Sequence, residues 1–237
     1  MVDSWQYWCP PAGSAVELGL VCGLSVALPV HFHPEDQITL VMSGKRRFVI
    51  HDELIEVVAG ESLTIPAGTV HRSLSDSADV CCINIYVPPE KYDERDLLAQ
   101  LPLLLRSRDG RTQLNGAVTL NGLHRTVAKG ARPGAPGAIH ISQWETVSQA
   151  ADRAGMTREG FSRRFKKLQG LPPEDFRLLS RLNDARRLLR TGEPIAMVAA
   201  EAGFSDQSHL SRCFRRFFGV TPGRYRGGVG GRSVADQ

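Results

Sequence analysis

The stretch that decides the fold of the carboxyl-terminal half is Ile195-Ala-Met-Val-Ala-Ala-Glu-Ala-Gly-Phe-Ser-Asp-Gln-Ser-His-Leu-Ser-Arg-Cys-Phe214. Its small alanines allow a short helix to approach its neighbours closely. Gly203 can end that helix with a positive φ, and Ser205 can cap the next helix. The apolar residues of the second helix share one buried stripe, formed by Leu210, Phe214 and Phe217. The pattern predicts a helix, a turn and a second helix.

An earlier copy of the same pattern lies 48 to 49 residues upstream. Its glycine is Gly155 and its capping residue is Thr157. The stripe of its second helix is predicted to contain Phe161, Phe165 and Leu168. The half therefore contains two copies of one supersecondary unit.

A connecting helix is predicted between the two copies, beginning at Pro173. Apolar residues follow one side of it, namely Phe176, Leu179, Leu182, Ala185 and Leu189, and arginines occur among the polar positions, namely Arg177, Arg181, Arg187 and Arg190. A rigid connection would let the two second helices enter successive major-groove segments, about 34 Å apart along one face of a duplex.

Charge is divided unevenly along the 237 residues. Residues 1–110 carry 8 Lys and Arg against 15 Asp and Glu, a net charge of −7, whereas residues 111–237 carry 21 against 10, a net charge of +11. Clustered Lys and Arg favour a polyanionic partner, because they release counterions from nucleic acid. Two ordinary solvated surfaces would be the simpler explanation of the charges alone. The duplicated helices favour double-stranded DNA as the partner.

These carboxyl-terminal motifs resemble the AraC/XylS-type transcription regulators, through the stretch quoted above and through Phe218-Gly-Val-Thr-Pro-Gly-Arg-Tyr-Arg226. The resemblance covers roughly residues 141–226 and implies that both second helices contact DNA. The implied contact residues, with neighbouring cationic positions, are Arg158, Glu159, Ser162, Arg163, Lys166, Gln207, Ser208, His209, Arg212 and Arg216. Gly160 and Glu159 depart from the expected pattern, since glycine weakens a helix and an anion faces phosphate.

The acidic half contains clustered histidines. Val30-His31-Phe32-His33 is predicted to begin a strand, on which residues two apart point to the same face. Further on, Gly60, Pro66, Gly68 and His71 have a spacing in which the turn can swing the last histidine toward the pair. Together with Gln37, these residues resemble the two cupin motifs. The resemblance spans about residues 15–88 and implies a β-barrel.

Metal-binding cupins use three histidines and a glutamate, which implies His31, His33, His71 and Gln37 here. Glutamine replaces the glutamate, and an amide oxygen is the weaker ligand. Three imidazoles nevertheless suffice for zinc, iron, nickel or copper. The alternative is a barrel that binds an organic effector with the same four residues. Ser75 replaces an asparagine often found after the last histidine, and Glu35 and Asp36 are nearby carboxylates that could substitute as ligands.

The fold class predicted is α+β multidomain, a cupin-like jelly-roll barrel followed by an all-α domain with two helix-turn-helix units. The predicted boundaries are 1–110 for the barrel, 111–138 for a helical and Gly- and Pro-rich linker, 139–228 for the helical domain and 229–237 for a disordered tail. A leucine-rich helix over 90–105 would pack on its own domain or dimerise. Residues 122–129 or 141–147 would supply a further helix before the first copy. The five cysteines are expected to be free thiols, because they form an odd set without a CxxC pair.

Three functional hypotheses remain open. The first is a ligand- or metal-responsive DNA-binding regulator that is cytoplasmic, homodimeric and not an enzyme, with RNA polymerase as a further partner. The second is a cupin metalloenzyme, such as an oxygenase, tethered to DNA. The third is a constitutive DNA-binding protein whose barrel only dimerises. No apolar stretch approaches the roughly 20 residues that would span a membrane, and the amino terminus lacks the features of a signal peptide.

Overall fold

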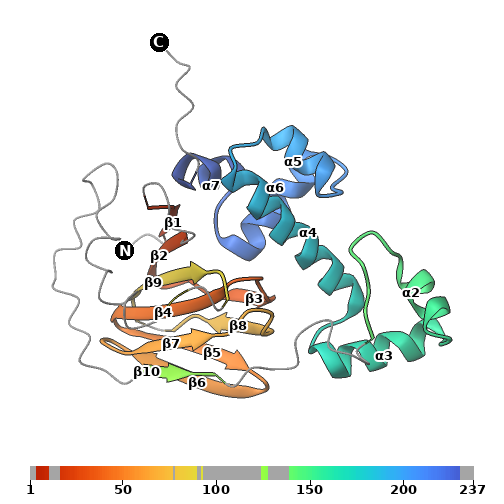
Figure 1. The fold of residues 1–237 in the computed structure, drawn as a ribbon. Coiled ribbons are helices and arrows are strands. Elements are labelled where there is room, and N and C mark those ends of the chain that lie inside the picture. Colours follow the sequence, from red (N-terminus) through yellow and green to blue (C-terminus); the bar gives the residue numbers. More distant parts are fainter. Residues whose placement is uncertain are drawn as a thin grey trace, which may run out of the picture.

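The structure is a computed structural model that describes residues 4–10, 17–76, 78–89, 92, 124–127 and 139–229. Figure 1 shows a β-sandwich built from the first part of the chain and a group of helices that lies beside it. This arrangement confirms the predicted fold class, a barrel followed by a helical domain.

Two sheets form the β domain. One has the strand order β1-β2-β9-β4-β7-β10 and the other the order β3-β8-β5-β6. All described pairs are antiparallel except β10 with β7. The strands are β1 Ser4–Trp8, β2 Glu17–Gly23, β3 Leu28–His31, β4 Asp36–Ser43, β5 Lys45–Ile50, β6 Glu53–Val58, β7 Ser62–Ile65, β8 His71–Leu74, β9 Val80–Val87 and β10 His124–Thr126.

Side chains of the central strands alternate between two buried faces. On β4, Ile38 and Leu40 belong to an apolar cluster on one face, whereas Gln37 and Thr39 lie on the other face, where both bond Asn84 of β9. Residues two apart on a strand share a face, so this register carries Gln37 into the interior. A polar network therefore extends through the middle of the sandwich.

The helices match the predicted duplication. They are α2 Val147–Arg153, α3 Arg158–Gln169, α4 Pro173–Arg190, α5 Ile195–Glu201, α6 Gln207–Phe218 and α7 Pro222–Val229. Gly155 and Gly203 have φ values of 63° and 74°, as expected for residues that end α2 and α5. The connecting helix α4 is one continuous element between the two units (Figure 1), and all five predicted apolar residues on it are buried.

Two details of the helix predictions are wrong. Leu168 is 46% exposed, and Gln169 takes the buried position that completes the stripe of α3. The cap of α6 is Asp206 rather than Ser205, since the Asp206 carboxylate accepts from the His209 backbone N–H. Aspartate and serine are both good caps, so the spacing alone did not separate two adjacent candidates.

Other predictions meet the structure only in part. Cys22 and Cys81, on paired strands, form a disulfide, so the expectation of five free thiols is wrong; Cys9, Cys82 and Cys213 are free. Residues 124–126 form a strand, and 141–146 precede α2 without helix, so neither segment supplies the extra helix. Most of the leucine-rich segment, the Gly- and Pro-rich linker and residues 230–237 lie outside the described residues. The predicted domain boundaries stay predictions.

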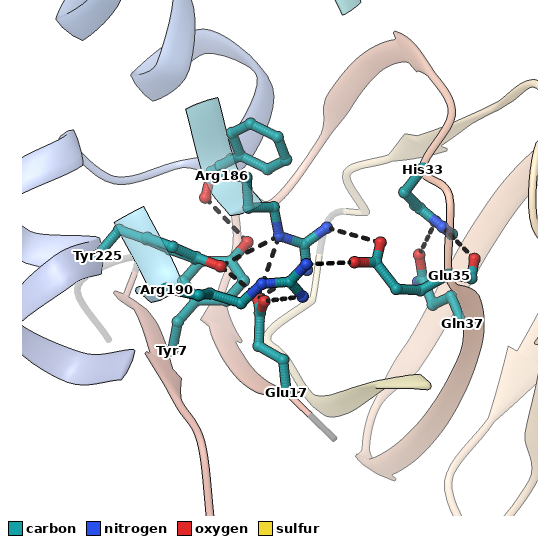
Figure 2. A network of polar contacts seen from close by, with 9 residues as sticks. Tyr7, Glu17, His33, Glu35, Gln37, Arg186, Arg190 and Tyr225 are labelled. Carbon is teal, nitrogen blue, oxygen red and sulfur yellow. Dashed lines mark hydrogen bonds and ion pairs between the residues drawn. The ribbon is translucent and has the colours of Figure 1, made fainter. Parts of the chain in front are cut away.

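A buried polar network joins the two domains (Figure 2). Arg186 of α4, which is 1% exposed, donates to Glu17 Oε1 at 2.6 Å and to the Tyr225 hydroxyl at 3.3 Å. Arg190 donates to Glu17 Oε2 at 3.1 Å and to Glu35 Oε1 at 2.8 Å. Because both carboxylates belong to the β domain and both guanidinium groups to α4, the network fixes the connecting helix on the barrel.

Candidate functional site

The structure brings His31, His33 and His71 together. One ring nitrogen of each lies within 4.8 Å of those of the other two, and all three side chains are buried. His31 ends β3, His71 begins β8, and the two are register partners across that strand pair. His33 follows β3, and its carbonyl accepts from the backbone N–H of Gly68 in the turn before β8. The predicted swing of His71 toward the pair is therefore present.

All three histidines are oriented by the backbone. Their Nδ1 atoms lie 2.8 Å from the carbonyl oxygens of Pro29, Glu35 and Thr69, for His31, His33 and His71 respectively. A carbonyl can only accept, so this contact places the proton on Nδ1 of His31 and His71 and leaves their Nε2 atoms as acceptors, whereas Nε2 of His33 also faces an acceptor. Such contacts fix the tautomer of metal-ligating histidines.

Gln37 extends the cluster. Its Oε1 lies 2.7 Å from His33 Nε2, and its amide nitrogen donates to Thr39 and Asn84. A neutral His33 has a single N–H for two acceptors, Gln37 Oε1 and the Glu35 carbonyl. A cation at His33 Nε2 would remove this competition. The Nε2 atom of His71 is buried without a hydrogen-bond partner among the described residues.

The electrostatics of the cluster favour uncharged imidazoles. Burial, followed by the proximity of His33, lowers the pKa of His31 to about 3. Burial also lowers the pKa of His33 and takes that of His71 well below its usual value. The three rings are therefore neutral at pH 7, the state in which histidine binds transition metals.

The two nearby carboxylates have other partners. Glu35 faces Arg186 and Arg190, and Asp36 accepts from the Ala67 backbone N–H and from Tyr92. Although burial raises the pKa of Glu35, the two arginines lower it below its usual value. The described donor set of the cluster is thus three imidazoles and one amide oxygen, which fits Zn²⁺, Fe²⁺, Ni²⁺ or Cu²⁺ with open positions.

Residues 31–35 connect the cluster to the helical domain. His31 and His33 point into the cluster, whereas the ring of Phe32 stacks on Phe176 of α4 at a centroid distance of 4.9 Å. The Phe32 carbonyl accepts from Asn183 at 3.1 Å. Figure 2 shows Glu35 between His33 and the two arginines of α4. A shift of this segment would therefore act on both domains.

The predicted DNA-contacting residues lie on the outer faces of α3 and α6. On α3, Arg158, Glu159, Arg163 and Lys166 are exposed and Ser162 is half-buried; on α6, Gln207, Ser208, Arg212 and Arg216 are exposed and His209 is half-buried. The buried faces carry Phe161 and Phe165 on α3 and Leu210 and Phe214 on α6. Both helices thus present polar and cationic groups away from the helical core.

A cavity of about 860 Å³ lies between the barrel and α3. Its barrel wall includes Val30, His71 and Arg72, and its helix wall includes Arg163 and Lys166. Two of the predicted DNA contacts therefore face a cavity that the barrel also lines. Spacing in the sequence contains no sign of this contact, because it depends on how the two domains pack.

Comparison with known proteins agrees with this geometry. Residues 150–228 match the model of a helix-turn-helix domain family, and residues 25–86 match that of the cupin domain family. The chain joins a cupin domain to an AraC-type helix-turn-helix domain. The cupin match includes all four predicted site residues, and the helix-turn-helix match includes both copies of the duplicated unit.

Relatives of known name match the second domain. The transcriptional regulator ArgR of Pseudomonas aeruginosa is 34% identical over 84 residues, which is 35% of this chain and 26% of that protein. The transcriptional activator RhaS of Escherichia fergusonii is 36% identical over 86 residues, which is 36% of this chain and 30% of that protein. The matched part thus spans less than a third of each relative.

The crystal structure of ToxT from Vibrio cholerae O395 resembles the whole arrangement. Its TM-score is 0.56 at 11% identity, covering 92% of this chain and 99% of that one. At this identity, the likeness concerns the two-domain fold alone. Among the described residues, no helix is long and apolar enough to cross a membrane.

Sequence reasoning missed the residues that join the domains. Arg186 lies on the predicted connecting helix, and Glu17 and Tyr225 lie far from it in the sequence. An arginine between the buried positions Ala185 and Leu189 was the only local signal. That signal shows which side Arg186 faces but not its partners.

Proposed function

We propose that this protein is a sequence-specific DNA-binding transcription regulator that responds to a ligand in its cupin domain. The observation that carries the proposal is the pair of helix-turn-helix units, whose second helices expose cationic faces and are joined by the single helix α4. The names of ArgR and RhaS support it, since both are called transcriptional regulators or activators. The partner is double-stranded DNA.

The residues proposed to contact DNA are those predicted from the sequence. The amino-terminal turn of a recognition helix reaches base edges, and flanking cations hold phosphates. Gln207, Ser208, His209 and Arg212 occupy the first half of α6, and Arg216 occupies its last turn. On α3, Arg158, Glu159, Ser162 and Arg163 likewise occupy the first half of the helix, and Lys166 is proposed to contact phosphate.

The proposed effector site is formed by His31, His33, Gln37 and His71. A divalent transition metal bound there would supply a positive charge and open positions for a small molecule. The chain contributes three neutral Nε2 donors held by backbone carbonyls, together with the amide oxygen of Gln37. An organic effector would use the same groups as hydrogen-bonding partners.

The response is proposed to pass through residues 31–35. Drawing His31 and His33 together around a ligand moves the segment that also carries Phe32 and Glu35. Those two residues contact α4, which joins both helix-turn-helix units. Differential affinity of the ligand for two arrangements of this segment would supply the coupling free energy.

Binding rather than turnover is the proposed role of the cupin domain. A homodimer, contact with RNA polymerase and a cytoplasmic location belong to the same proposal. They rest on the resemblance to regulators and on the basic helical half.

DNA binding by the full chain, with and without metal, tests this function. A duplex is first recovered by selection from a random library, and its dissociation constant is measured after EDTA treatment and after addition of Zn²⁺ or Ni²⁺. We expect tighter binding to this duplex than to a scrambled one, and a change of about fivefold or more when metal is added. Absence of a preferred duplex would overturn the regulator proposal. The same affinity with and without either metal would leave the organic effector as the one to test, by repeating the measurement with small-molecule extracts.

A further inference from the structure

We propose that Glu159 makes the first helix-turn-helix unit specific for a C·G base pair, by accepting a hydrogen bond from the N4 amino group of cytosine in the major groove. This inference rests on the proposed function and deepens it, because it names one base pair that the DNA site contains. The second unit has Ser208 at the equivalent position, 49 residues later. The two halves of the DNA site should therefore differ in sequence.

Glu159 lies on the exposed side of the amino-terminal turn of α3. It is the second residue of the helix, and Phe161 and Phe165 are buried on the other side. Glu159 and Arg163 are four residues apart and both are exposed, so they share one face of the helix. The amino-terminal turn of a recognition helix is the part that reaches base edges. In the proposed complex, Glu159 would therefore lie at the bases.

The described part of the protein leaves the Glu159 carboxylate unused. The amino-terminal cap of α3 is Thr157, whose side chain accepts from the Gly160 backbone N–H at 3.1 Å. Among the described residues, Glu159 forms no ion pair or hydrogen bond, not even with Arg163 one turn later. The α3 residues that line the cavity beside the barrel begin at Arg163, so Glu159 lies outside that cavity. Its carboxylate is available as an acceptor at the surface.

An anion in the major groove needs a hydrogen-bond donor on a base. The phosphates on both sides of the groove are negative, so a carboxylate there weakens binding unless a hydrogen bond compensates for the repulsion. The major groove offers two amino donors, N6 of adenine and N4 of cytosine. The adenine amino group lies between two acceptors, adenine N7 and thymine O4, whereas the cytosine amino group has the acceptor O6 of guanine on one side only. Cytosine is therefore the base expected for Glu159.

Arg163 supplies a donor on the same face of α3. Four residues rise about 6 Å along a helix, which is close to two base-pair steps of about 3.4 Å each. A guanidinium pairs bidentately with O6 and N7 of guanine, so Arg163 fits a guanine within about two base pairs of the cytosine. In α6, Arg212 is the equivalent arginine, but the hydroxyl of Ser208 can donate or accept and selects no base. Glu159 thus distinguishes the two halves of the site and fixes the direction in which the chain lies on DNA.

The base preference of the full chain and of two variants, Glu159→Ala and Glu201→Ala, tests the inference. Glu201 is the matched control, because it is an exposed glutamate of α5 without an ion pair or hydrogen bond among the described residues and is not a proposed base contact. Duplexes are selected from a random library with each protein, and dissociation constants are measured at one salt concentration. We expect the unmodified chain and Glu201→Ala to prefer C·G over T·A by about fivefold or more at one position, because thymine O4 replaces the amino donor by an acceptor. Glu159→Ala should show a preference below about twofold at this position.

N4-methylcytosine at that position isolates the hydrogen bond. This base still pairs with guanine, but a methyl group takes the place of the N–H that faces the major groove. We expect the modified base to weaken DNA binding of the unmodified chain and of Glu201→Ala by about fivefold or more, and that of Glu159→Ala by less than about twofold. A general disturbance of the duplex by the methyl group would instead weaken all three proteins equally and would count against the inference.

Two results would overturn the role of Glu159. One is a Glu159→Ala variant that selects the same bases with the same discrimination as the unmodified chain, in which case Glu159 only stabilises the amino terminus of α3. The other is a changed base preference at a position that is not a C·G pair. A chain that selects no duplex would reject the proposed function together with this inference, whereas a preferred duplex with an unchanged base pattern would reject the inference alone. Thermal unfolding of each variant distinguishes a lost base contact from a lost fold.

Discussion

Replacement of Arg186 by methionine should test how strongly the two domains are held together. Arg186 is almost completely buried and forms hydrogen bonds to Glu17 and Tyr225, with Glu35 Oε2 at 3.7 Å. Its guanidinium also lies over the ring of Tyr86 at 4.1 Å. Methionine keeps much of the side-chain volume and removes the charge, so the measured effect reports the network rather than a cavity.

The expected loss is roughly 3 kcal/mol of the free energy of unfolding. Removing one partner of a buried ion pair leaves a buried charge uncompensated, which typically costs about 3 to 5 kcal/mol. Arg190, which lies 3.1 Å from Glu17 and 2.8 Å from Glu35 in the unmodified protein, remains in this variant to pair with both carboxylates, which places the expectation at the lower end. The second change Glu17→Gln removes the carboxylate that Arg186 leaves behind, so it should recover part of the loss.

Urea denaturation at pH 7, followed by tryptophan fluorescence, measures these differences. The double-mutant cycle of Arg186→Met and Glu17→Gln should give a coupling energy of about 1 to 3 kcal/mol. Arg187→Met is the matched control on the same helix, because its ion pair with Asp184 is exposed and 3.8 Å long. We expect the control to change the free energy of unfolding by less than about 0.5 kcal/mol. A loss below about 1 kcal/mol in Arg186→Met, or additive effects in the cycle, would refute the reasoning.

Further predictions concern DNA, the histidines and the contact with β1. Arg212→Ala should cost about 1 to 3 kcal/mol of binding free energy on the selected duplex, because Arg212 is proposed to contact a base, and an equal loss on scrambled DNA would make Arg212 a phosphate contact. The DNA affinity of the unmodified chain should fall linearly with salt concentration on a log–log plot. Isothermal titration with Zn²⁺ should show binding by the unmodified chain and none by the double variant His31→Ala, His33→Ala, which should keep the metal-free DNA affinity. In EDTA, the free energy of unfolding should fall as the pH drops from 6.5 toward 3. Burial and the proximity of His33 lower the pKa of His31 to about 3, so the unfolded chain binds this proton at a higher pH than the folded chain does. A free energy of unfolding that stays constant between these pH values would contradict a neutral, buried His31. Gly219→Ala should destabilise by roughly 1 to 3 kcal/mol, because Gly219 has a φ of +75° and its Cβ would lie 2.5 Å from the Trp5 ring, whereas Gly227→Ala has open space around it and should be tolerated.

Local pattern was sufficient to predict the helical domain. Gly155 and Gly203 end helices with positive φ, and Thr157 caps α3, because these roles depend on residues close in the sequence. The histidine cluster was also predictable, since His31 and His33 are two residues apart and His71 follows a turn of recognisable spacing. Each of these features needs only the geometry of one element or one turn.

Contacts between the domains were not predictable in the same way. The partners Glu17 and Arg186 are 169 residues apart, and Phe32 and Asn183 are 151 apart. Helical spacing from Leu182 and Leu189 places Arg186 on the buried side of α4, but nothing in the local sequence indicates its partners. Leu168 is a different case with a local cause, because a helical stripe through Phe161 and Phe165 can continue at either residue 168 or residue 169, and Gln169 is the one that is buried.

The position of the carboxylates around the histidines connects this site to the helical domain. Residue 37, a glutamate in metal-binding cupins, is glutamine here, and the nearby Glu35 pairs with α4 instead. A glutamate at position 37 would neutralise part of a bound divalent charge, whereas Gln37 leaves that charge intact. The nearest glutamate, Glu35, instead pairs with Arg190 and faces Arg186. A cation at His33 would therefore attract the same carboxylate that holds α4, and its charge would act on Glu35 against two arginines rather than being cancelled within the cluster. In the proposed response, the glutamine that makes the site a weaker metal ligand set would also leave the charge of a bound cation to act on Glu35 and, through it, on the connecting helix.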